Sequence, residues 1–112
     1  MDAVSRNIHT LLSAIKKSSE YKEYRRQEEI LNKDPELAER VSQFRAANFR
    51  MQNEGNKENL FHMADDLARE SAELRRNAQV NAYLDAEFAM CRLMQQVCRS
   101  LIEGIDISVP RL

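Results

Sequence analysis

The feature that most constrains this chain is a ladder of mainly apolar residues near its C-terminus, spaced alternately by four and three positions. Its members are Val80, Leu84, Glu87, Cys91, Met94, Cys98, Leu101 and Ile105. This alternation keeps one side of an α-helix facing one partner over many turns. A second apolar row, formed by Tyr83, Met90, Leu93 and Val97, runs beside the ladder. The predicted helix should therefore touch more than one neighbour.

This helix is expected to span about residues 78–105, which corresponds to a length of roughly 40 Å. A compact domain of 112 residues is narrower than that. Part of the ladder should therefore lie against a second chain, and we expect a homodimer. The candidate interface residues on this helix are Leu84, Glu87, Cys91, Met94, Cys98 and Leu101.

Four shorter helices are expected before the long one, because capping residues precede amphipathic segments. The caps are Ser18 or Ser19, Asp34 before Pro35, Asn56, and Asn77 for the long helix itself. The first helix should cover about residues 2–17, and the fourth should end near residues 75–76. Gly55 interrupts the heptad phase, which indicates a hairpin between the third and fourth helices or a kink in one long helix.

The composition supports the same fold class. Two glycines and two prolines leave little turn material for a β-rich protein. The sequence therefore predicts an all-α fold, an antiparallel bundle of about five helices with a long C-terminal helix, completed by dimerisation. One domain should cover residues 1–112, with residues 105–112 as a short C-terminal tail.

The charge distribution argues against two classes of partner. The 17 basic and 18 acidic side chains are interleaved, so a concentrated positive face for nucleic acid is not expected. No stretch approaches the ~20 apolar residues of a membrane span. The start, residues 1–18, lacks the apolar run of a signal peptide. We expect a cytoplasmic protein that does not bind membranes.

Cys91 and Cys98 are the first residues to consider for metal or redox chemistry. Seven residues apart on a helix, their Cα atoms are roughly 10 Å apart, too far for a shared metal ion or an intrachain disulfide. We interpret them as small core residues, with a thiol or metal sensor as the alternative. Neither a catalytic motif nor a cofactor site is evident, so no enzyme activity, metal or cofactor is expected.

Two polar residues stand within apolar seams, and two histidines stand outside them. Glu87 in the long ladder and Asn48 in the third helix either fix helix register or bind a ligand, and we favour the structural role. His9 and His62 lie off the apolar stripes of their helices, so we expect both to be solvated.

Residues 16–26 hold the densest basic cluster, with Tyr21 and Tyr24 inside it. Basic and aromatic side chains together could bind RNA, but Glu20 and Glu23 dilute the positive charge. We favour a solvated helix surface, with the two tyrosines packed inward or acting as anchors for a protein partner. An RNA-binding accessory protein remains the alternative.

Three segments resemble the YlbF/YmcA family of small bacterial helical proteins. They are residues 12–24, residues 31–36 and residues 77–87, the last being similar to the family's Tyr-Leu-x-Ala-Glu motif. Ala78 departs from the Pro that usually stands there, and the length is similar to that of the short YheA-like branch. The resemblance implies a helical, often dimeric adaptor without catalytic activity. It further implies a regulatory partner of an endoribonuclease complex, with effects on competence, sporulation and biofilm formation.

Overall fold

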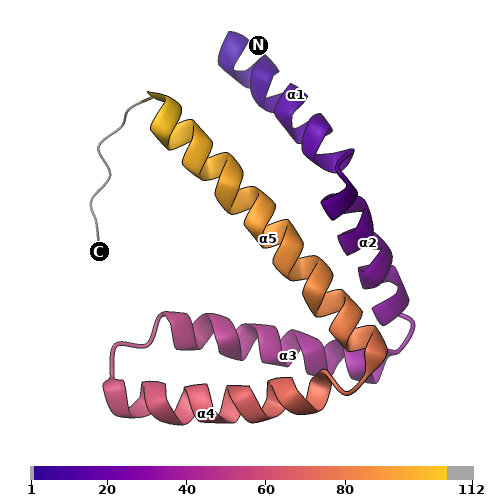
Figure 1. The fold of residues 1–112 in the computed structure, drawn as a ribbon, viewed down its shortest axis with the longest axis vertical. Coiled ribbons are helices and arrows are strands. Elements are labelled where there is room, and N and C mark those ends of the chain that lie inside the picture. Colours follow the sequence, from indigo (N-terminus) through magenta and orange to yellow (C-terminus); the bar gives the residue numbers. More distant parts are fainter. Residues whose placement is uncertain (1, 106–112) are drawn as a thin grey trace. The chain divides into compact units, whose positions relative to one another are not determined.

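The structure, a computed structural model, describes residues 2–105, and these residues form five α-helices and no strand (Figure 1). The helices are α1 (Ala3–Lys16), α2 (Ser19–Leu31), α3 (Pro35–Gln52), α4 (Lys57–Leu74) and α5 (Ala78–Ile105). The predicted all-α fold and the long C-terminal helix are thereby confirmed. The predicted tail after Ile105 lies outside the described residues.

Polar side chains cap the N-termini of the helices, among them Asp34 and Asn77 at predicted positions. Asp34 accepts a hydrogen bond from the Leu37 amide at 3.2 Å, and Asn77 accepts one from the Gln79 amide at 2.9 Å. Asp2, which was not predicted as a cap, accepts a hydrogen bond from the Ser5 amide at 2.8 Å at the start of α1, and this hydrogen bond lowers the pKa of the Asp2 carboxyl. Each cap supplies an acceptor to an amide group that has no partner within the helix.

The chain divides into two compact units, which are described separately. Unit 1 joins Met1–Tyr24 to Asp85–Leu112, and unit 2 consists of Arg25–Leu84. Helices α2 and α5 each contribute residues to both units. The prediction of a single domain stays a prediction, because compactness of a unit does not show that it folds alone.

Unit 2 contains most of the buried core. Its buried apolar residues are Leu31, Val41, Leu74, Val80, Tyr83 and Leu84. Gln27 is buried among them and accepts a hydrogen bond from the side chain of Gln79 at 2.6 Å. The first two turns of α5 thus belong to the core of unit 2, where the amide pair satisfies a buried polar group.

Helices α3 and α4 of unit 2 pack against each other as an antiparallel hairpin (Figure 1). Arg40 on α3 forms ion pairs with Glu70 at 3.2 Å and Glu73 at 3.3 Å on α4, and the Glu70 carboxylate raises the pKa of Arg40. The hairpin interpretation of the Gly55 region is confirmed. However, α3 ends at Gln52, so Gly55 lies in the loop rather than directly after the helix.

In unit 1, α1 and the C-terminal part of α5 run in opposite directions (Figure 1). Residues from both helices are half-buried, among them Leu11 and Ile15 of α1 and Leu93 and Val97 of α5. Among the described residues of this unit, Ala86 is the one buried apolar side chain. Unit 1 therefore buries less apolar side-chain surface than unit 2 does.

Candidate protein-interaction site

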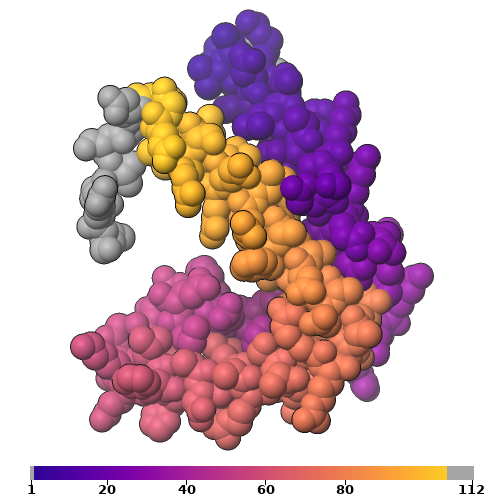
Figure 2. Space-filling view, in the orientation of Figure 1, coloured from indigo at the N-terminus to yellow at the C-terminus, as the bar shows by residue number. Residues whose placement is uncertain are grey.

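The part of α5 that belongs to unit 1 carries two apolar faces with different surroundings. The row formed by Met90, Leu93 and Val97 is half-buried. From Cys91 onward the 4-3 ladder is exposed, and its members are Cys91, Met94, Cys98, Leu101 and Ile105. We call these five residues the exposed ladder. The orange-to-yellow helix in Figure 2 is α5, with α1 in indigo.

The structure distributes the eight predicted interface residues over three environments. Cys91, Met94, Cys98 and Leu101 are brought together on the exposed ladder. Leu84 belongs instead to the buried core of unit 2. Glu87 is half-buried, and its Oε2 atom is buried. Tyr21 and Tyr24 are half-buried on α2.

The prediction that Cys91 and Cys98 are small core residues is wrong for the single chain. Both thiols are free and exposed. The physical reason is that α5 turns its other apolar row, which includes Leu93 and Val97, into unit 1. The two cysteines share the outward side with Met94 and Leu101, and residues 2–105 leave this side exposed.

Apolar exposure in unit 1 extends beyond the ladder. Eight large apolar side chains of this unit are between 39% and 69% exposed, namely Val4, Ile8, Leu12, Phe88, Met94, Leu101, Ile102 and Ile105. Three of these side chains lie on α1 and five on α5.

Three phenylalanines are exposed that were not identified from the sequence. Phe88 is 63% exposed on α5, while Phe49 and Phe61 are 68% and 76% exposed on α3 and α4. All three stand beside the apolar stripe of their helix rather than within it. The sequence did contain a signal for them. Each is a large aromatic residue beside an apolar stripe, at a position where a polar residue is expected, and this indicates an exposed apolar side chain.

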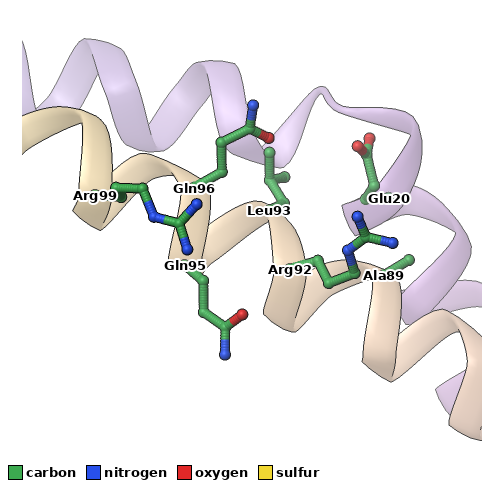
Figure 3. A pocket seen from close by; sticks show the side chains of 7 residues that line it. All are labelled: Glu20, Ala89, Arg92, Leu93, Gln95, Gln96 and Arg99. Carbon is green, nitrogen blue, oxygen red and sulfur yellow. The ribbon is translucent and has the colours of Figure 1, made fainter.

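A polar pocket of unit 1 has a volume of about 520 Å³. Figure 3 shows Arg92, Gln96 and Arg99 of α5 with Glu20 of α2 around it; Ala89, Leu93 and Gln95 complete the lining. The guanidinium of Arg92 also lies 5.9 Å from the ring centre of Phe88. Guanidinium and amide groups bind and orient anions, but no serine, cysteine or histidine lines this pocket to act as a nucleophile or base.

The remaining candidates for ligand chemistry lie apart from one another. His9 and His62 are exposed, on α1 and α4 respectively. Within residues 2–105, no group of three or more His, Cys, Asp or Glu side chains is arranged to hold a metal ion. Within the same range, no helix combines the length and apolar character needed to cross a membrane.

The basic cluster of residues 16–26 is exposed at each of its five cations. Arg25 forms an ion pair with Glu28 at 2.7 Å, and Glu20 and Glu23 remain among the cations. Neighbouring acids weaken the attraction for a polyanion. RNA binding by this cluster stays a prediction.

Comparison with known proteins gives one match. The family model described as "Control of competence regulator ComK, YlbF/YmcA" matches residues 4–106, which is nearly the whole chain. Neither the curated proteins nor the solved structures contain a match.

Proposed function

Because the chain belongs to the YlbF/YmcA family, we propose that it is a non-catalytic regulatory protein that acts by binding other protein chains. The family description refers to control of the competence regulator ComK, which is a regulatory role. The observation that carries the proposal is the exposed ladder of α5. An apolar strip of this length on a small chain is typical of a protein interface.

The first binding partner in this proposal is a second copy of the chain. The exposed ladder is an apolar face of α5 that the described residues of unit 1 leave exposed. A helix with two apolar faces can pack on its own unit with one face and on another chain with the other. Met94 and Leu101 lie near the middle of the exposed ladder, where truncation should weaken binding most.

Light scattering on the purified chain at several micromolar concentrations tests this self-association. The wild type should show twice the mass of one chain. The variant Met94→Ala/Leu101→Ala should shift toward the monomer, with the dimer at least about tenfold weaker. Phe61→Ala is the matched control, because Phe61 is exposed on the hairpin of unit 2. A wild type that is monomeric at every concentration would contradict the proposal.

The second surface in the proposal consists of Tyr21 and Tyr24. Tyrosine rings contribute strongly to binding at interfaces, and both of these rings are partly accessible. By family resemblance, a component of an endoribonuclease complex is the candidate partner. Pull-downs from native cell extract with tagged wild type should recover such a component. The variant Tyr21→Ala/Tyr24→Ala should lose it while keeping its helical circular dichroism, and equal recovery by both proteins would reject this surface.

A further inference from the structure

A second set of exposed residues on α5 also follows the alternating spacing of four and three. It consists of Phe88, Arg92, Gln95, Arg99 and Ile102, and we call it the arginine strip. With 3.6 residues per turn, the strip lies about a third of a turn around α5 from the exposed ladder. All five side chains are exposed, Phe88 at 63% and Ile102 at 40%. Residues with this spacing can pack along a second helix, as they do in a coiled coil.

The arginine strip carries positive charge. Between residues 88 and 102, α5 contains two charged side chains, Arg92 and Arg99, and no carboxylate. Within residues 2–105 neither guanidinium forms an ion pair, and that of Arg92 lies 5.9 Å from the ring centre of Phe88. The Cα atoms of the two arginines are roughly 10 Å apart along the helix. An acidic partner can therefore form two ion pairs here without breaking one that the described residues make.

Both arginines also line the polar pocket of unit 1, together with Gln95 and Gln96 (Figure 3). Among the lining residues Glu20 is the one acid, and its carboxylate accepts a hydrogen bond from Ser19 Oγ at 3.0 Å. Two guanidinium groups and one carboxylate leave the pocket with a net positive charge. Guanidinium groups bind carboxylates through paired hydrogen bonds, and side-chain amides can donate further ones. The pocket is therefore suited to carboxylate side chains of a partner.

A second copy of the chain is a poor partner for this strip. Two copies that paired through it would bring four arginines and no carboxylate together, whichever way the helices run. Like charges along one interface oppose association. A partner with acidic residues opposite Arg92 and Arg99 has the complementary charge, and apolar residues of that partner would cover Phe88 and Ile102.

Nucleic acid fits the strip less well than an acidic helix does. Binding to a polyanion depends on many cations, each of which neutralises a phosphate. The strip has two cations, and an exposed apolar side chain stands at each of its ends. An amphipathic helix with acidic residues would cover the apolar ends and pair with both cations.

We propose that the arginine strip binds an amphipathic α-helix of another protein, in which two acidic residues seven positions apart face Arg92 and Arg99. The spacing of seven applies to either direction of the partner helix, because the two arginines are themselves seven residues apart. This inference rests on the proposed function, because it gives the chemistry of a protein partner. It concerns a different face of α5 from the exposed ladder.

Synthetic peptides of three heptads test the charge requirement by fluorescence anisotropy. The labelled Glu probe carries Leu, Glu, Gln, Glu and Leu on one face, at spacings of four and three, with Ala and Gln elsewhere. A version with reversed spacings suits the opposite helix direction, and each Lys probe has Lys in place of both Glu residues. At about 0.15 M salt, the wild type should bind a Glu probe at least about tenfold more tightly than its Lys counterpart, because two ion pairs replace two repulsions.

Three variants locate the bound probe. Arg92→Glu/Arg99→Glu should reverse the preference and bind the Lys probe more tightly. The matched control Lys33→Glu/Lys57→Glu makes the same change in net charge at exposed positions of unit 2, and it should keep the preference for the Glu probe. Glu20→Gln should bind the Glu probe at least about twofold more tightly than the wild type does, because it removes the acid from the pocket. Circular dichroism verifies that each variant keeps its helices.

The inference would be overturned by a wild type that binds neither Glu probe, that binds Glu and Lys probes equally, or whose preference survives in Arg92→Glu/Arg99→Glu. Tighter binding of a labelled oligouridine RNA, lost in this variant, would also overturn it, because the arginines would then serve nucleic acid. Light scattering keeps the test apart from the self-association proposal. A monomeric wild type that prefers the Glu probe rejects the dimer alone, whereas a dimer without that preference rejects the acidic partner alone.

Discussion

Leu74 shows how strongly a single residue can hold unit 2 together. It ends α4 and is 1% exposed within the core that includes Val41 and Val80. The buried residues of this core come from several helices, and removing part of a buried side chain leaves a cavity that lowers stability. In contrast, Leu60 lies on the same helix and is 38% exposed.

We therefore expect Leu74→Ala to lower the free energy of unfolding by about 2–5 kcal/mol. The matched control Leu60→Ala should lower it by less than about 1 kcal/mol, because the side chain is already partly in water. Urea unfolding followed by circular dichroism measures both values at one fixed protein concentration. Equal losses for the two variants would show that the core of unit 2 does not depend on Leu74.

At the level of the helices, local chemistry was enough to predict most boundaries. Asp34 and Asn77 form hydrogen bonds with amide groups two or three residues ahead, so the start of a helix can be read from a short segment. The break in heptad phase near Gly55 predicted a hairpin or a kink, and the structure shows a hairpin between α3 and α4. These features depend on neighbours in sequence rather than on distant contacts.

Which face of a helix is covered could not be predicted in this way. Periodicity placed Cys91 and Leu93 on two adjacent apolar rows of α5, but it does not say which row packs on the rest of the chain. The structure half-buries Leu93 and exposes Cys91. The choice depends on α1 and the start of α2, which are some seventy residues away in sequence. The sequence therefore identified the residues of the candidate interface, but it did not predict which of them are exposed and which are buried.

At the level of the whole molecule, self-association would change the environment of Cys91 and Cys98. Both thiols are exposed in the single chain, and both lie on the exposed ladder. A dimer that covers this ladder must also cover their sulfur atoms. A maleimide reagent reacts only with a thiolate that it can reach, so the labelling rate reports the covered fraction.

We expect the wild type, at a concentration where light scattering shows a dimer, to be labelled at least about tenfold more slowly than Met94→Ala/Leu101→Ala. The cysteines are identical in both proteins, and labelling in denaturant should give equal rates, which controls for intrinsic reactivity. Diluting the wild type should raise its rate toward that of the variant, because dissociation exposes the thiols. If a wild-type dimer were labelled as fast as the monomeric variant, the subunits would have to meet through another surface, and the exposed ladder would remain available to a different protein.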